Sequence, residues 1–384
     1  MYKPMKITQL LFKNQFLVVS GKDEIEDPLK ANLILGFGSK RLVADEQLSN
    51  LLKDRYPSAE MLLCSTAGEI AYNSVYDDSA VITVISFEKT TIKTASLNLE
   101  AFNDSFELGK SLIQQFDITG LNSILILSDG LLVNGSQLVS GMEASNRGNV
   151  LITGGLAGDG TLFENTLVGL NEIPKNGTVA AVGFYGDHID VRSSSVSGWD
   201  VFGPERIVTS ANGTDVYEID NRSAVDLYKI YLGPYIDDKT NSTLLFPLAV
   251  KLPGRSHFIA RSIMSVSNEK NCMIFSGDIP EGSTVRFMKA NFEKLIDAAD
   301  RAAKEISRED VNYAPELAIL ISCVGRRIIL GKQVEEEVGV VADYFTNKTA
   351  IAGFYSYGEI SPQMNIGPCQ LHNQTMTITT FNEI

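Results

Sequence analysis

Two kinds of apolar pattern alternate along the chain. Continuous apolar runs at Ile124–Leu127 and Leu317–Ile321 are typical of central strands that are covered on both faces. Apolar residues at helical spacing predict amphipathic helices, and the clearest set is Phe292, Leu295, Ile296, Ala299, Ala303 and Ile306. Asp104, with Glu107 three residues later, resembles a capping box and predicts the start of another helix, which Gly120 ends.

The predicted elements follow the same order twice: a strand pair, a helix, a buried strand, a second helix, a short motif and a further strand. The first copy is predicted at residues 81–87, 91–97, 104–116, 124–127, 134–147, 151–160, 161–170 and 178–185. The second is predicted at residues 272–275, 284–288, 292–306, 317–321, 325–345, 351–360 and 375–381. This order predicts an α/β fold of internally duplicated mixed β-sheets covered by helices, in two tightly packed halves.

The chain is long enough for more than one core. A length of 384 residues predicts two domains or a duplicated pair. The turn Leu232-Gly233-Pro234 follows a predicted helix and marks the boundary. We therefore predict an extension at residues 1–30, a first domain at 31–232 and a second at 233–384.

One local pattern occurs three times: an apolar strand, then small and hydroxyl residues, then Gly followed by a carboxylate. The copies span residues 61–70, 151–160 and 351–360, and their acids are Glu69, Asp159 and Glu359. Strand ends of this kind are where open α/β folds place ligands, so the pattern predicts a pocket ringed by carboxylates. The alternative is that each acid caps a nearby helix or pairs with an arginine.

A second candidate site is the corner Ser322-Cys323-Val324-Gly325-Arg326-Arg327, where a buried strand leads through Gly325 into a helix. Free N–H groups at a helix start attract anions, and Arg326 or Arg327 could clamp a carboxylate; alternatively, solvent surrounds both arginines. Aromatic residues near the strand ends could line the pocket or belong to the core. The predicted ligand-binding residues are Glu69, Asp129, Gly155, Asp159, Cys323, Gly325, Arg326, Arg327, Tyr355 and Glu359.

Composition and charge exclude several classes of partner. The net charge of −14 argues against nucleic acids and anionic membrane surfaces. Four widely separated cysteines fit a reducing compartment. The chain shows no signal peptide and no apolar run near the roughly 20 residues that span a bilayer. We therefore expect a soluble cytoplasmic protein.

Motifs for catalysis are absent from the sequence. The three histidines lie in no GxSxG or HExxH setting, and no residue spacing indicates a metal site or a P-loop. We therefore expect a protein that is not an enzyme and carries no metal. A hydrolase that uses Cys64, Ser65 or Cys323 as nucleophile is the weaker alternative.

Several motifs, in their order along the chain, resemble the FIST proteins (F-box and intracellular signal transduction). The resemblance runs over roughly residues 30 to 375 and covers an N-terminal and a C-terminal FIST domain. Three shorter segments also contribute to the resemblance: Gly198-Trp199, Val208-Thr209 and Tyr228…Tyr231-Leu232-Gly233. The main motifs are Ser-Asp-Gly-Leu at 128–131, Gly-Gly-Leu-Ala-Gly-Asp-Gly at 154–160, Ser-Cys-Val-Gly-Arg-Arg at 322–327, Gly-Phe-Tyr-Ser-Tyr-Gly-Glu-Ile at 353–360 and Leu-His-Asn-Gln-Thr at 371–375.

The resemblance implies a cytoplasmic sensory module that binds a small ligand such as an amino acid. No output domain follows the second FIST domain, so we expect signalling through a separate protein, such as a histidine kinase or a cyclase. We expect no cofactor, the ligand's carboxylate at Cys323–Arg327 and its cationic end at the three acids. One branch of the family implies an alternative, a haem-binding nitric-oxide sensor with His257 as axial ligand. A scaffold with an empty pocket is a further alternative.

Overall fold

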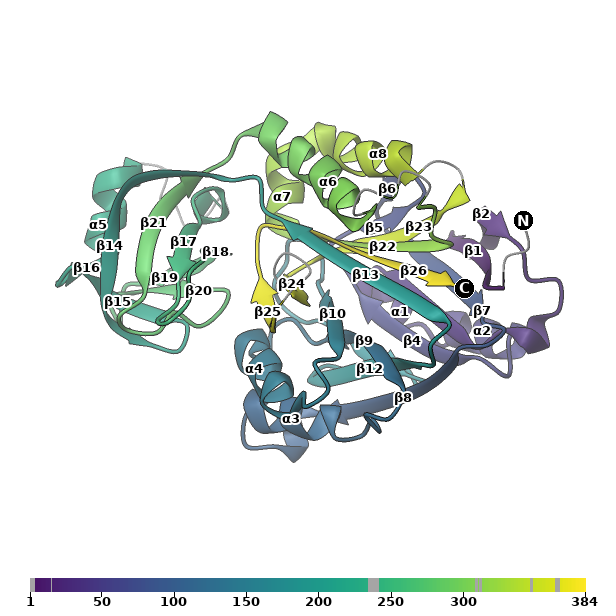
Figure 1. The fold of residues 1–384 in the computed structure, drawn as a ribbon. Coiled ribbons are helices and arrows are strands. Elements are labelled where there is room, and N and C mark those ends of the chain that lie inside the picture. The colour runs from purple at the N-terminus through teal and green to yellow at the C-terminus, as the bar shows by residue number, and fades with distance from the viewer. Residues whose placement is uncertain are drawn as a thin grey trace.

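The computed structural model describes residues 4–14, 16–233, 242–307, 310, 313–345, 348–362 and 367–384. A large body of three six-stranded sheets carries a smaller lobe, which contains an eight-stranded sheet (Figure 1). The chain enters the lobe after β13 and leaves it before α6, as Figure 1 shows. The predicted mixed α/β fold, with sheets covered by helices, is therefore confirmed.

Each sheet of the body is built around three strands in the same arrangement. A parallel pair forms first, and a third strand then returns antiparallel beside the first member of the pair. The first sheet has β3 (Leu33–Gly38), β4 (Glu60–Ser65) and β7 (Ala80–Ser86). The second has β9 (Leu121–Ser128), β10 (Leu151–Leu156) and β12 (Thr178–Tyr185), and the third has β22 (Leu317–Cys323), β23 (Ala350–Ser356) and β26 (Met376–Glu383). The topology thus shows three copies of this shorter repeat. The strands predicted at 272–275 and 284–288 to open the second copy belong to the lobe sheet instead.

The three repeats exchange strands in a ring. After its parallel pair, each repeat sends a short strand to another sheet: β5 pairs with β23, β11 with β4, and β24 with β10. The strands that follow the first two returns do the same, since β8 joins β12 and β13 joins β26. The matching place in the first sheet is taken by β1, from the start of the chain, which joins β7. The bounds are β1 (Lys6–Lys13), β5 (Glu69–Ala71), β8 (Thr91–Asn98), β11 (Val168–Leu170), β13 (Ile189–Val196) and β24 (Gly358–Pro362).

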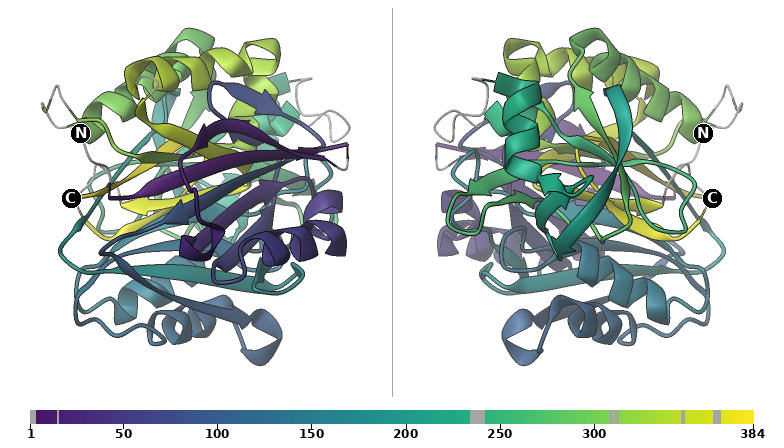
Figure 2. Two further views of the ribbon diagram at one scale, coloured as in Figure 1. Left: turned by 90° about the vertical axis from the view of Figure 1, so that its right-hand side faces the viewer. Right: turned by 90° about the vertical axis from the view of Figure 1, so that its left-hand side faces the viewer.

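The ring is completed by three outer strands and covered by helices. The strands β2 (Phe16–Asp23), β6 (Ser74–Tyr76) and β25 (Cys369–His372) lie beside β1, β5 and β24. Figure 2 shows the first sheet in front in one view and the lobe in front in the other. The helices of the body are α1 (Lys40–Val43), α2 (Glu46–Arg55), α3 (Ser105–Ile113), α4 (Gly135–Ser145), α6 (Phe292–Ser307), α7 (Val324–Leu330) and α8 (Val334–Phe345).

Both faces of the central strands are buried, as the continuous apolar runs predicted. On the inner side, Leu35, Leu127 and Ile319 from the three sheets belong to one buried cluster. On the outer side, Ile126 packs within the cluster that includes residues of α3, α4, α6 and α8. Burying a Leu or Ile side chain contributes roughly 1.5–3 kcal/mol, so the shared core holds the three repeats together.

Two predicted helices differ in detail, and the first, α3, already ends at Ile113 and not at Gly120. The Asp104 cap is confirmed, because its carboxylate accepts a hydrogen bond from the Glu107 N–H at 2.9 Å. The predicted helix at 325–345 is interrupted: α7 ends at Leu330, and Gly331 has a φ of 53°. Such a left-handed conformation suits glycine and stops a helix, so α8 starts afresh at Val334.

The lobe lies in the chain between the second and third repeats. Its core packs Tyr228 and Phe287 edge to face, with ring centroids 4.9 Å apart. Gly233 lies within the lobe, and Pro234 is outside the described residues. The predicted domain boundaries stay a prediction. The elements of the lobe are β14 (Asp200–Asn212), β15 (Asp215–Ile219), β16 (Arg222–Ser223), α5 (Ala224–Leu232), β17 (Leu248–Lys251), β18 (Ile259–Arg261), β19 (Ile263–Ser267), β20 (Cys272–Phe275) and β21 (Thr284–Lys289).

Candidate functional site

The three strand-end motifs meet at the centre of the ring. The Ala67 N–H donates to the Tyr355 carbonyl at 2.8 Å, and the Gly158 N–H donates to the Ser65 carbonyl at 3.0 Å. A third link joins the Tyr357 N–H to the Leu156 carbonyl at 3.2 Å. The structure therefore brings the three copies of the motif together.

Glu69 and Glu359 occupy matching positions and are both buried. Glu359 accepts hydrogen bonds from the Ser356 hydroxyl at 2.6 Å and from the Thr375 hydroxyl and N–H at 2.8 and 3.2 Å. Burial raises the pKa of Glu359 to about 8, although these hydrogen bonds act in the opposite direction. The carboxyl joins the end of β23 to the residue before the return strand β26.

The same arrangement recurs at Glu69. Its oxygens accept from the Thr66 hydroxyl at 2.6 Å and from the Ser79 hydroxyl at 2.7 Å, one residue before the return strand β7. Burial raises the pKa of Glu69 to about 7. In both copies these hydrogen bonds fasten a return strand, and their donors are neither a helix end nor an arginine.

Asp159 does not share this arrangement. In the third repeat, the short strand β24 places Glu359 opposite Gly155. In the second repeat, the short strand β11 places Val168 opposite Cys64, so a valine takes the place of the glutamate. Asp159 instead accepts hydrogen bonds within its own loop, including one from the Asn165 N–H at 2.9 Å. Although burial disfavours its charge, bonds from Tyr357 and from backbone N–H groups hold its pKa below the ordinary value.

The remaining acid, Asp129, also serves a turn. It is buried and accepts from the N–H groups of Leu131 and Leu132 at 2.8 and 2.7 Å. Its second oxygen accepts from the Gly177 N–H at 2.9 Å. Ligand contact by the four acids stays a prediction, but their described oxygens already have protein donors.

The predicted anion site at the start of α7 is filled by protein. Arg326 is fully buried, forms an ion pair with Glu337 at 2.7 Å, and donates to the Leu295 carbonyl at 2.7 Å. The side chain of Gln374 lies directly against Gly325. Protein groups therefore occupy the start of α7 around Gly325 and Arg326, and ligand binding at Cys323–Arg327 stays a prediction.

Arg327 and Tyr355 are also held by protein. Arg327 forms two hydrogen bonds with Asp77, at 2.8 and 2.7 Å, at the edge of a shallow surface cleft. The buried Tyr355 hydroxyl donates to Glu337 at 2.8 Å, so this ring belongs to the core.

The thiols proposed as alternative nucleophiles are inaccessible. Cys64 and Cys323 are buried, and burial raises the pKa of both above the ordinary value. A nucleophilic cysteine must reach its thiolate form. The Ser65 hydroxyl accepts from the Leu167 N–H at 2.9 Å. Among the residues that the structure describes, no group of three or more His, Cys, Asp or Glu side chains is placed to hold a metal ion.

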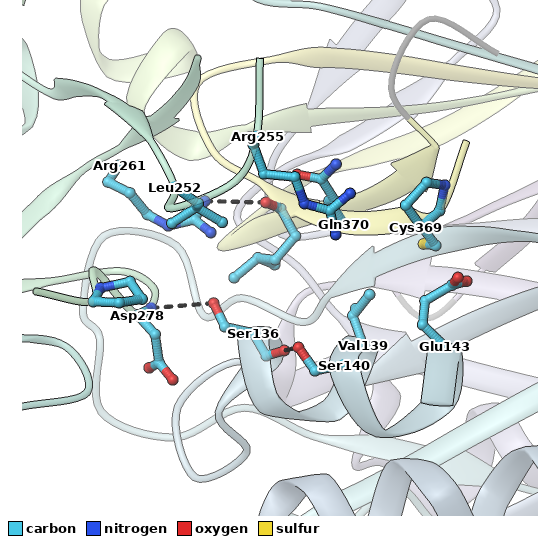
Figure 3. A pocket seen from close by; sticks show the side chains of 13 residues that line it. Ser136, Val139, Ser140, Glu143, Leu252, Arg255, Arg261, Asp278, Cys369 and Gln370 are labelled. Carbon is cyan, nitrogen blue, oxygen red and sulfur yellow. Dashed lines mark hydrogen bonds between the residues drawn. The ribbon is translucent and has the colours of Figure 1, made fainter. Parts of the chain in front are cut away.

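An open cleft lies elsewhere, between the lobe and the body. Its volume is about 360 Å³, and its walls come from α4, β25, β18 and two loops of the lobe (Figure 3). Its polar and charged lining includes Ser136, Glu143, Arg255, Arg261, Asp278 and Gln370. None of the sequence-predicted site residues lines this cleft.

Arg261 is a buried cation without an ionic partner. Only 3% of it is exposed, and no carboxylate lies within 4 Å of it in the described parts of the chain. Its Nη1 donates to the carbonyls of Leu371 at 3.0 Å and Ala260 at 3.2 Å, whereas Nε has no acceptor. Burial lowers the pKa of Arg261 to about 10, against the opposing attraction of the Asp278 carboxylate beyond 4 Å, so Arg261 remains charged at neutral pH. A buried unpaired charge is costly, which favours an anion from outside the chain.

Gln370 leaves a complementary acceptor without a partner. It is 9% exposed, and its Nε2 lies 3.2 Å from Nε2 of His257. Its Oε1 has no donor among the described residues. His257 is half-buried at this contact, so the histidine of the haem alternative already has a polar neighbour.

The other charged side chains surround this pair. Arg255 is exposed at the mouth of the cleft, and Glu143 projects from α4 (Figure 3). Asp278 closes one end, because its N–H donates to the Ser136 hydroxyl at 3.1 Å and its carboxylate accepts from Asn134 at 2.8 Å. The cleft lining thus presents two arginines, two carboxylates and the unpaired amide oxygen of Gln370.

Sequence reasoning missed this cleft because its residues come from distant segments. Ile259-Ala260-Arg261 resembles an ordinary strand whose arginine faces solvent. The one available signal was the Leu-His-Asn-Gln-Thr motif at 371–375, which adjoins Gln370 and supplies the Leu371 carbonyl that Arg261 contacts.

Comparison with protein families gives two matches that together span most of the chain. The FIST N domain matches residues 32–222, and the FIST C domain matches residues 224–362. The chain belongs to the FIST family. FIST domains are generally sensory domains of signal transduction.

Other comparisons add no functional argument. A chorismatase structure is 8% identical over 99% of this chain and 100% of its own, with a TM-score of 0.38. A cyanuric acid hydrolase from A. caulinodans is 9% identical over 99% of each chain, with a TM-score of 0.39. A search of curated proteins found no match. Among the residues that the structure describes, no helix is both long and apolar enough to cross a membrane.

The cleft lies at the junction of the two FIST domains. Ser136 and Glu143 belong to the FIST N domain, whereas Arg255, Arg261 and Asp278 belong to the FIST C domain. A ligand in this cleft would therefore contact both domains.

Proposed function

We propose that the protein is a non-catalytic sensory module whose small ligand binds in the cleft between its FIST domains. The ligand carries a carboxylate, bound by Arg261 and Arg255, and an ammonium group, bound by Oε1 of Gln370. An amino acid meets both requirements. The observation behind this proposal is that two buried side chains lining one cleft leave a donor and an acceptor without partners.

The energetics favour an anionic ligand. A carboxylate on a guanidinium forms charge-assisted hydrogen bonds, roughly twice as strong as neutral ones. Arg261 has already lost most of its hydration, so its attraction for an anion is weakly screened. The volume of about 360 Å³ lies at the small end of ligand pockets and suits a metabolite of this size.

Signalling then follows from the place of the cleft. A ligand that contacts both FIST domains shifts their relative arrangement only if it binds one arrangement more tightly. Trp199, the only tryptophan, packs where the lobe meets the body, with Ala260 from the lobe and Leu295 from the body. Its fluorescence therefore reports on the contact between the lobe and the body. The signal passes to a separate cytoplasmic partner, such as a histidine kinase or a cyclase.

Thermal-shift measurements test the proposal. The panel contains the amino acids, each with its carboxamide and its deaminated acid, at millimolar concentration. At least one amino acid should raise Tm and change the Trp199 fluorescence, because a ligand at 100 times its Kd stabilises by about 2.7 kcal/mol. Its carboxamide should have no effect.

Matched variants locate the binding. Arg255→Gln and Gln370→Leu should reduce the shift in Tm, whereas Arg41→Gln, which removes an exposed arginine on α1, should leave it unchanged. A panel in which no compound raises Tm would overturn the proposal. So would full binding by both cleft variants.

A further inference from the structure

The cleft continues along α4 into a second cavity. This cavity has a volume of about 440 Å³, and it shares Glu143, Pro368 and Cys369 with the first. It extends past the end of the helix to Asn146 and Val150. The two cavities form one groove, which we call the α4 groove.

The length of the α4 groove follows from helix geometry. Ser136, Val139, Glu143 and Asn146 line it at helical spacing, so one face of α4 forms a wall along its whole length. Ten residues separate the first from the last, which corresponds to about 15 Å at 1.5 Å per residue. Opposite lies β25, an edge strand that pairs with β24 alone within the sheet.

The α4 groove carries Arg261 and Asp278 at its first end and the carboxylate of Glu143 partway along, where the two cavities meet. Gly277 lies between Arg261 and the start of α4. A Cβ added to it would lie 2.8 Å from Nε of Arg261 and 2.7 Å from the Ser136 hydroxyl. Arg261 is therefore level with the start of α4. Glu143 is seven residues further along, about 10 Å away. One of its oxygens accepts from Asn146 at 3.2 Å, and no cation lies within 4 Å of it in the described segments.

This separation exceeds the reach of a single α-amino acid, whose ammonium and carboxylate are attached to the same carbon. An extended peptide advances about 3.4 Å per residue, so three residues span about 10 Å and four to five fill about 15 Å. Edge strands beside a groove are a recurring way to bind extended peptides. The orphan Oε1 of Gln370, on β25 between the two ends, can accept a peptide N–H.

We propose that the α4 groove binds a short extended peptide of three to five residues with free termini. Its C-terminal carboxylate binds Arg261 and Arg255, and its N-terminal ammonium binds Glu143 when the peptide has three residues. The inference rests on the carboxylate site of the proposed function and assigns it a ligand class, in which Oε1 of Gln370 accepts a peptide N–H instead of an ammonium group. It also explains why a carboxylate-binding arginine and an unpaired glutamate line the same groove.

Equilibrium dialysis against random peptide pools tests this inference. Equimolar pools of one to six residues, with free or amidated C-termini, are dialysed against the full chain, and mass spectrometry measures the retained species. Peptides of three to five residues with free C-termini should be retained at least tenfold better than single amino acids and amidated peptides. Glu143→Gln should weaken retention of tripeptides but not of N-acetylated tripeptides. Glu335→Gln, at an exposed acid on α8, should change neither.

The outcomes separate the two proposals. Retention of single amino acids at least as strong as that of tripeptides overturns the peptide inference and leaves the proposed function standing. Equal loss of free and N-acetylated tripeptides on Glu143→Gln also overturns the inference. Equal retention of amidated and free peptides, or no retention at any length, overturns both.

Discussion

Replacing Glu359 by glutamine should make the protein less sensitive to alkaline pH. The Glu359 carboxyl is fully buried and contacts only the hydroxyl and N–H groups of Ser356 and Thr375 at hydrogen-bonding distance among the described residues. Its pKa rises from an ordinary value of 4.5 to about 8 through burial. Glutamine matches the protonated carboxyl in shape and carries no charge.

The sign follows from proton binding. Between pH 4.5 and 8 the folded state keeps a proton that the unfolded state releases, so the stability from this group is complete below 4.5 and is lost as pH rises through about 8. One group changes the free energy of unfolding by at most about 1.4 kcal/mol per pH unit. The glutamine variant should therefore gain about 2 kcal/mol on the wild type between pH 5.5 and 7.5.

Urea denaturation at pH 5.5, 6.5 and 7.5, followed by circular dichroism, measures this difference. Both proteins contain His372, whose pKa is lowered to about 4 by burial and which therefore changes stability with pH in the opposite direction. Taking the difference between their free energies of unfolding cancels this contribution. Glu335→Gln is the exposed control. If wild type and Glu359→Gln lose stability in parallel across this range, the carboxyl is ionised in the fold and the reasoning fails.

Further predictions concern single contacts. Glu69→Gln should show the same trend over a narrower range, because the pKa of Glu69 is raised only to about 7. Glu337→Gln should cost about 3–5 kcal/mol in the free energy of unfolding by urea, since it leaves Arg326 buried without its ion partner; a loss within that of the Glu335→Gln control would contradict the buried pair. Asp104→Ala should cost about 1 kcal/mol by removing the cap of α3, and an unchanged urea midpoint would show that the cap contributes nothing.

Local patterns in the sequence predicted local structure well. The runs at 124–127 and 317–321 proved to be central strands, because the residues on both faces of each strand are apolar and can be buried. Asp104 caps its helix as its spacing predicted. The interruption at Gly331 could not be read from periodicity, because apolar spacing continues through it. Glycine alone does not decide between a tolerated helix position and a left-handed turn.

Long-range features were beyond this reasoning. The exchange of β5, β11 and β24 depends on pairings between segments up to several hundred residues apart, and no local pattern encodes a partner strand. The acids at 69 and 359 were predicted to line a pocket, yet their hydroxyl partners Ser79 and Thr375 lie at the far end of each repeat. Arg261 became notable only when its burial and its lack of an ion partner were known.

The most direct test of the cleft as a ligand site is isothermal titration calorimetry on the wild type and Arg261→Gln. The titrant is the compound that raises Tm most in the thermal-shift panel, and circular dichroism confirms that the variant is folded. The wild type should bind one equivalent, and the variant should bind at least tenfold more weakly, because it lacks the buried cation. Equal affinities in the two proteins would contradict the account.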